Sequence, residues 1–97
     1  MTVGQMTYNQ VAILNDQYLD IKPSTAGVEW VIQNIVIPFG SSCELYHSDG
    51  VNNILDLITS TSLHEYTFHC NPSSYYRLKN VSGTTIYASY DGLITKE

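Results

Sequence analysis

The sequence of 97 residues predicts an all-β protein, a sandwich or small barrel built from antiparallel sheets. Short runs of alternating apolar and polar residues recur along the chain, giving about eight strands, and turn-forming residues separate them every ~8–12 residues. No segment carries the helical period of apolar residues over a sufficient length. The length is that of one domain, and we expect a single β domain over residues 11–97, preceded by an N-terminal arm over residues 1–10.

The first strands are short. Residues 1–10 are mostly polar, which is typical of an arm that is disordered or becomes ordered on a partner. Residues 11–14 and residues 18–21 are apolar runs separated by a turn-prone Asn-Asp pair, so each is predicted to form a short strand. Pro23 ends the second strand, because proline has no N–H to donate to a neighbouring strand.

Residues 28–37 form the longest strand candidate. Its alternation changes phase near Gln33-Asn34, which indicates either a β-bulge or a strand that is covered on both faces. Trp30 is the single tryptophan, and its size favours a position in the core. Stacking on a sugar is the alternative role for this ring.

Residues 42–47, 53–59 and 65–70 are the next strand candidates. Asp49-Gly50 marks the turn between the first two, and a Ser-Thr run separates the second from the third. In the third run, Tyr66, Phe68 and Cys70 fall on one face by alternation.

Two alternating runs within residues 75–90 flank Ser82-Gly83, a pattern that predicts a β-hairpin. One face of this hairpin is expected to join Trp30 and Phe68 in the core; it carries Tyr76, Leu78, Ile86, Ala88 and Tyr90. The other face is our candidate contact surface for a partner; it carries Tyr75, Arg77, Lys79 and Tyr87. Asp91-Gly92 is expected to be a turn before a short tail.

The charge balance excludes two classes of partner. The formal net charge is −5, and the four basic residues are Lys22, Arg77, Lys79 and Lys96. Nucleic acids and anionic membranes attract clusters of Lys and Arg, so we expect neither as a partner. No signal peptide is visible, which predicts synthesis in a cytoplasm with Cys43 and Cys70 as buried reduced thiols; a disulfide between neighbouring strands is the alternative.

The sequence does not predict an enzyme. His47 and Asp49 run into a turn and should diverge, and the adjacent His69 and Cys70 should point to opposite faces. Cys43 with His64 is the one nucleophile and base pair that the sequence leaves open. Acidic residues are scattered singly, and the chain contains no glycine-rich phosphate loop, so we expect no metal and no cofactor.

Tyrosine is abundant and charge is scarce. Eight tyrosines are too many for the core of so small a domain, and charged residues make up only 13% of the chain, against about 25% in typical domains. Exposed tyrosines on a surface with little charge favour contact with protein or stacking on a sugar. Scattered tyrosines without a role are the remaining alternative.

Several segments together resemble a family of small bacteriophage proteins encoded among virion structural genes. They are Gly27-Val28-Glu29-Trp30-Val31-Ile32-Gln33-Asn34-Ile35, Glu44-Leu45-Tyr46, Asp49-Gly50, Phe68-His69-Cys70, Tyr76-Arg77-Leu78-Lys79-Asn80, Ser82-Gly83 and Tyr90-Asp91-Gly92. The resemblance implies a jelly-roll-like β-sandwich without catalytic residues. It also implies a capsid decoration or cement protein, or a head or tail appendage.

Decoration proteins of this kind are often trimers, so the resemblance implies two partners: further copies of the chain, and the major capsid protein or another virion protein. It places the protein in the virion after synthesis in the bacterial host. The alternative function is a carbohydrate- or receptor-binding module of a phage head or tail fibre, in which exposed aromatic rings contact a surface glycan. Residues 38–42, 60–64 and 71–74 do not match the family pattern.

Overall fold

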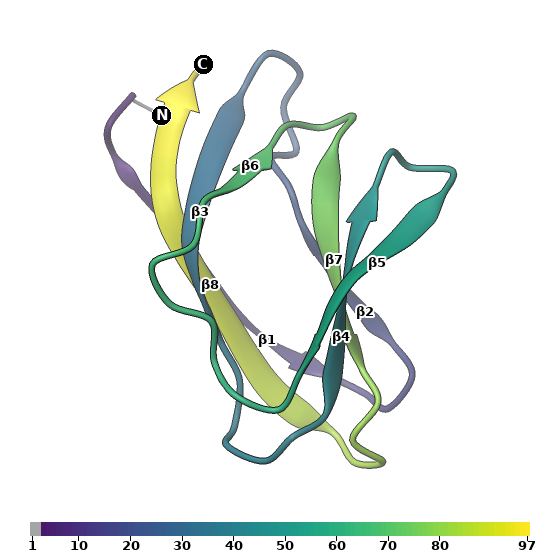
Figure 1. The fold of residues 1–97 in the computed structure, drawn as a ribbon. Helices are drawn as coiled ribbons and strands as arrows, with labels where there is room; N and C mark the ends of the chain where they lie inside the picture. Colours follow the sequence, from purple (N-terminus) through teal and green to yellow (C-terminus); the bar gives the residue numbers. More distant parts are fainter. Residues whose placement is uncertain (1–2) are drawn as a thin grey trace.

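The computed structural model describes residues 3–97, which form two antiparallel sheets packed face to face (Figure 1). Sheet A has the strand order β1 (Met6–Ile13), β8 (Ile86–Lys96), β3 (Glu29–Val36) and β6 (Phe68–Cys70). Sheet B has the order β2 (Tyr18–Ile21), β7 (Tyr75–Asn80), β4 (Cys43–Ser48) and β5 (Asn53–Thr59). The predicted all-β sandwich is confirmed, and its eight strands follow the predicted runs closely.

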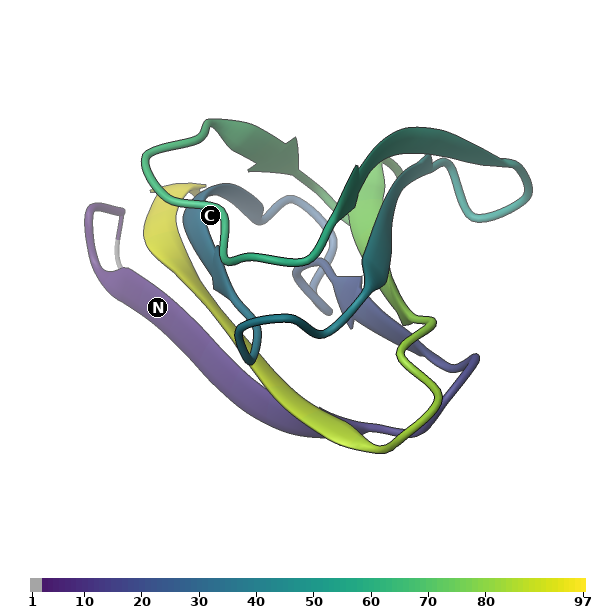
Figure 2. The same ribbon diagram turned by 60° about the horizontal axis from the view of Figure 1, so that its bottom comes forward.

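The N-terminal segment is more ordered than the sequence predicted. Residues 6–10 were expected to belong to an arm, but they form the first part of β1, which pairs with β8 from Met6 opposite Leu93 to Ile13 opposite Ile86. Figure 2 shows β1 and β8 running side by side along one layer. Threonine and tyrosine are good strand residues, and at an edge strand polar neighbours are tolerated, so a polar run did not exclude a strand. Residues 1–2 of the expected arm lie outside the described residues.

The predicted hairpin around Ser82-Gly83 is wrong. β7 belongs to sheet B, where it pairs with β2 and β4, whereas β8 belongs to sheet A, where it pairs with β1 and β3. Residues 81–85 therefore carry the chain from one sheet to the other. The turn residues do reverse the chain, but each strand finds its partners in a different layer.

The bulge predicted near Gln33-Asn34 is confirmed. Ile32 pairs with Gly92 and Asn34 pairs with Asp91, so Gln33 is the extra residue in β3. A side chain on Gly92 would collide with the carbonyl oxygen of Val31, and glycine is required there for the close approach of the two strands. Asp91-Gly92 is thus not the predicted turn, because β8 continues through both residues.

The core lies between the inner faces of the two sheets. Trp30, Phe68, Leu78, Ile86, Ala88 and Tyr90 are buried there as predicted, and Tyr76 packs partly buried against them. The predicted reduced thiols are confirmed, since Cys43 and Cys70 are both buried free cysteines. Burial raises the pKa of the Cys70 thiol to about 12, which keeps this thiol protonated and unreactive.

Asn80, at the end of β7, is fully buried and hydrogen-bonds in four directions. Its Nδ2 donates to the carbonyl oxygens of Ile13 at 2.8 Å and Thr84 at 2.6 Å. Its Oδ1 accepts from the backbone N–H and the hydroxyl of Ser82, at 2.9 and 2.7 Å. Gln17 and Asp16 hydrogen-bond to the backbone of the same residue. One side chain thereby holds the β1–β2 turn and the β7–β8 connection together.

We expect the substitution Asn80→Ala to destabilise the fold by about 2–4 kcal/mol, because it removes the side-chain donor of the buried Ile13 carbonyl group and the acceptor of the Ser82 N–H. Urea unfolding followed by circular dichroism measures the free energy of unfolding. Asn53→Ala is the matched control, since Asn53 is exposed on β5 and its loss should change stability by no more than about 0.5 kcal/mol. Equal stability of the two variants would contradict the role of Asn80.

Candidate interaction surface

The four predicted contact residues lie on two different faces. Tyr75, Arg77 and Lys79 alternate along β7 on the outer side of sheet B, whereas Tyr87 lies on β8 on the outer side of sheet A. The structure therefore does not bring Tyr87 together with the other three. The prediction of one shared surface depended on the hairpin and is wrong for the same reason.

Tyr75 is also not a surface residue, although the alternation predicted that it would be. Its exposed fraction is only 6%. The ammonium group of Lys22 lies 4.5 Å from the centre of the Tyr75 ring, and the β4–β5 turn at Gly50 approaches its hydroxyl. Alternation gives the face of the sheet on which a residue lies, but other segments can still cover it.

Arg77 and Lys79 do lie together, and both are close to the Tyr18 ring. Arg77 Nε donates to Asp20 Oδ1 at 2.6 Å, and its guanidinium lies 4.1 Å from the centre of the Tyr18 ring. Lys79 Nζ lies 5.7 Å from the same ring centre. These cations are engaged by groups of their own chain, so they are poorly placed to bind an anionic partner.

Tyr46 completes this cluster on sheet B. Its ring meets the Tyr18 ring edge to face, with 5.9 Å between ring centres. Its hydroxyl donates to Glu44 Oε1 at 2.7 Å, and this hydrogen bond, followed by desolvation and the charge of Glu44, raises the pKa of Tyr46 to about 12. Over β2, β7 and β4 the outer face of sheet B is thus a network of paired charges and aromatic rings, and the exposed Leu55 and Ile58 of β5 lie beside it.

The outer face of sheet A is different in character. We use this name for the outward side chains of its three longest strands: Met6, Tyr8, Gln10, Ala12, Glu29, Val31, Gln33, Asn34, Val36, Tyr87, Ser89, Asp91, Leu93, Thr95 and Lys96. Its charged members are Asp91, which accepts a hydrogen bond from Asn34 Nδ2 at 2.8 Å, and the pair Glu29 and Lys96 at one end of the face, 3.9 Å apart. The exposed fractions of Tyr87 and Tyr8 are 66% and 56%, and Met6, Val36 and Leu93 are exposed as well. An exposed sheet face with this much apolar area and so little charge has the composition of a protein contact surface.

Tyr87 was predicted from the sequence as an exposed contact residue, whereas Met6, Tyr8 and Leu93 were not. Met6 and Tyr8 were expected in an arm and Leu93 in a tail, so their side chains had no place in a predicted sheet. The alternation of Met6, Tyr8, Gln10 and Ala12 is a period of two that could have revealed them.

A row of aromatic rings connects the two sheets. Tyr66 stacks on Phe68 with 5.2 Å between ring centres, Phe68 meets Tyr76 edge to face at 4.8 Å, and Tyr76 stacks on His47 at 4.8 Å. His47 Nε2 is also within 3.0 Å of Ser74 Oγ, beside a small hollow of about 150 Å³. The stack holds the His47 ring in place, as a packing residue on β4, an inner strand of sheet B.

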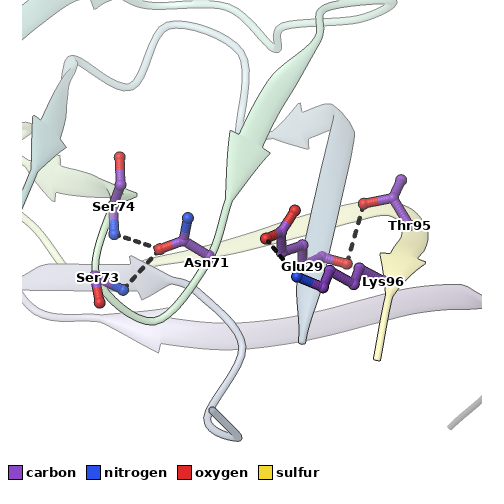
Figure 3. Close-up of polar contacts among 6 residues, drawn as sticks. All are labelled: Glu29, Asn71, Ser73, Ser74, Thr95 and Lys96. Carbon is purple, nitrogen blue, oxygen red and sulfur yellow. Dashed lines mark hydrogen bonds and ion pairs between the residues drawn. The ribbon is translucent and has the colours of Figure 1, made fainter. Parts of the chain in front are cut away.

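A larger hollow of about 340 Å³ lies between residues 26–29 and 71–73. Asn71 Oδ1 accepts the N–H groups of Ser73 and Ser74, both at 2.8 Å, which fixes one wall (Figure 3). Glu29 is the only charged residue of the lining, and its carboxylate lies 3.9 Å from Lys96 Nζ. A single carboxylate beside an exposed lysine has no second acid, base or ligand with which to perform catalysis or hold a metal.

Within residues 3–97 no group of three or more His, Cys, Asp and Glu side chains converges as a metal site would require. In the same part of the chain we find no helix with the length and apolarity to cross a membrane. The expectation that the protein is not an enzyme stays a prediction.

The fold resembles a known architecture. The core of Drosophila NLP, whose crystal structure is described as providing insight into pentamer formation and histone binding, superposes with a TM-score of 0.56 and 10% sequence identity. The match covers 96% of this chain and 100% of that chain. The protein thus has a nucleoplasmin-like jelly-roll β-sandwich fold. No protein-family model matches the sequence, and no curated protein matches it.

We expect the substitution Glu44→Ala to lower the pKa of Tyr46 toward the ordinary value of about 10, because it removes both the acceptor and the negative charge. NMR of ring-labelled tyrosine resolves this one hydroxyl during a pH titration. The raised pKa means that the native state holds the Tyr46 proton more tightly than the unfolded chain does. Its contribution to stability is therefore complete below about pH 10 and is lost as the pH rises through about 12.

Glu29→Ala is the control for this titration, since Glu29 lies on β3 in the other sheet. An unchanged Tyr46 titration in the Glu44→Ala variant would contradict the assignment of the hydrogen bond.

Proposed function

We propose that this chain is a structural protein of a bacteriophage particle. In this proposal it is a capsid decoration or cement protein that binds further copies of itself and the major capsid protein or another virion protein. It acts by binding alone, is made in the cytoplasm of the host and remains in the virion.

The outer face of sheet A carries this proposal. Its exposed Tyr8 and Tyr87 present large rigid rings, and its two carboxylates already have partners, since Asp91 is hydrogen-bonded to Asn34 and Glu29 lies beside Lys96. Desolvating this face therefore removes water from apolar groups and from few charges, which favours tight contact with another protein. The part of the outer face of sheet B formed by β2, β7 and β4 is less suited, because its cations already interact with Asp20 and Tyr18.

Two further observations support an assembly role. Segments of the sequence resemble small phage virion proteins, as described above. The Drosophila NLP core, which has the same architecture, is described in connection with pentamer formation, so a sandwich of this shape is compatible with oligomers. Its histone binding has no counterpart in our proposal, because the nine acidic residues of this chain are scattered singly and form no acidic tract.

A carbohydrate- or receptor-binding module is the second candidate. It is favoured by the spacing of the two exposed rings. Tyr8 lies directly opposite Asp91, and Tyr87 lies four residues further along β8, or roughly 13 Å from Asp91 at the usual rise of a strand. Two rings at this spacing could stack on two sugars of one glycan chain. A glycan array on which the protein gives no signal would remove this candidate.

Mass spectrometry of purified phage particles tests the main proposal directly. The protein should be present in many copies per particle, and its absence from intact particles would overturn the proposal.

We expect Tyr87→Ser to weaken binding of the protein to particles that lack it by roughly 1–2 kcal/mol, which is about 5–30-fold in Kd. The fold should be unaffected because Tyr87 is exposed. Phe39→Ser is the matched control: Phe39 is also exposed, but it lies in the β3–β4 loop, outside the outer face of sheet A. Binding that is equally strong for Tyr87→Ser and Phe39→Ser would reject this face as the contact surface.

A further inference from the structure

The two longest edge strands of the sandwich are left unpaired on one side. β1 is an edge of sheet A and pairs with β8, and β5 is an edge of sheet B and pairs with β4. Each edge presents a row of backbone N–H and C=O groups that can accept another strand. The other two edges, β2 and β6, have only four and three residues.

Both edges have few of the features that normally prevent pairing between molecules. Edge strands are usually protected by lysines, prolines, other charges or β-bulges. β1 contains no charged residue, no proline and no bulge, and β5 is protected at one point only, where the charged Asp56 forms a bulge opposite Leu45 and Tyr46. The apolar side chains of β5 are exposed on both of its faces, with exposed fractions of 69% for Ile54 and 68% for Ile58.

We propose that β5 of one copy pairs with β1 of the next copy, so that the protein associates with itself head to tail. The lengths of the two strands match, at seven and eight residues. Both views place β1 and β5 on opposite sides of the molecule (Figures 1 and 2), so one copy can use both edges at once. Such a heterologous contact forms a ring if the rotation between copies closes.

Charge favours this pairing over a symmetric pairing of two β5 strands. Two β5 strands in antiparallel register about their centre would place Asp56 opposite Asp56, and like charges directly opposite each other are destabilising. Pairing with β1 places Asp56 against an uncharged strand. It also covers Ile54, Leu55 and Ile58 with side chains of the neighbouring copy, which accounts for apolar residues on both faces of an edge strand. This inference deepens the proposed self-association, and it does not depend on which virion protein the outer face of sheet A binds.

Sedimentation velocity of the purified protein tests the inference. The double variant Ile54→Lys/Ile58→Lys places two lysines on β5, and we expect self-association at least tenfold weaker than that of the unmodified protein. Val51→Lys/Phe39→Lys is the matched control, with the same change in charge at exposed loop positions, and it should associate normally. If the β5 variant associates like this control, or the unmodified protein stays monomeric up to about 1 mM, the proposal is overturned.

Mixing two variants tests the head-to-tail arrangement itself. The variant Met6→Lys/Gln10→Lys blocks β1 but keeps β5, and the β5 variant keeps β1. Each alone should be monomeric, and an equal mixture should form one-to-one dimers that grow no further. A mixture that remains monomeric excludes this pairing, because the mixture contains an intact β5 on one variant and an intact β1 on the other. Symmetric contacts between two β1 or two β5 strands would instead allow one of the variants to dimerise alone.

Hydrogen exchange of the unmodified protein provides a measurement that needs no variant to fold. Amide exchange in β1 and β5 should slow together as the protein concentration rises, while β2 and β6 should be unaffected. Exchange in β1 and β5 that is independent of concentration would overturn the proposal. All three measurements use the protein alone, so their outcome is separate from the particle-binding test of the proposed function.

Discussion

The arrangement of the sheets depends on the hydrogen bonds of one buried residue, Asn80. The chain passes from sheet A to sheet B for the first time between β1 and β2, and it crosses between the sheets for the last time between β7 and β8. The side chain of Asn80 binds Ile13 from the first crossing and Thr84 from the second, so the two crossings lie against each other. This contact explains why β1 neighbours β8 in one layer while β2 neighbours β7 in the other. β8 and β7 are inner strands of their sheets, and on their other sides they pair with β3 and β4, respectively.

The positions of the strands could be predicted because a period of two is a local property of the sequence. The same holds for the bulge at Gln33, where the period changes phase within one strand. The choice of layer is not local, and this is why the connection at Ser82-Gly83 was mistaken for a hairpin. A turn residue shows where the chain reverses, but the sheet that the next strand joins is decided by the strands with which it pairs. Asp91-Gly92 illustrates the opposite case, in which a turn-like pair is straightened by the close approach of Val31.

The candidate site was predictable only in part. Tyr87 is exposed as alternation predicted, whereas Tyr75 is covered by Lys22, and nothing in the sequence near Tyr75 reveals that contact. Arg77 and Lys79 were placed on the correct side of their strand, but their value as contact residues changed once Asp20 and Tyr18 were found beside them. The free surface is defined by what other strands leave uncovered, which is a property of the assembled sheets and not of a single strand.

The pairing of β1 with β8 also sets the order in which the protein can fold. These strands come from opposite ends of the sequence, so sheet A is completed only after nearly the whole chain has been closed into a loop. Contacts between such distant segments slow folding, and β-sandwiches accordingly fold in milliseconds to seconds. During synthesis β1 emerges first and its only neighbour in the sheet emerges last. β1 therefore has no partner in the sheet until β8 has been synthesised, and both of its edges are free to pair with another chain during that time.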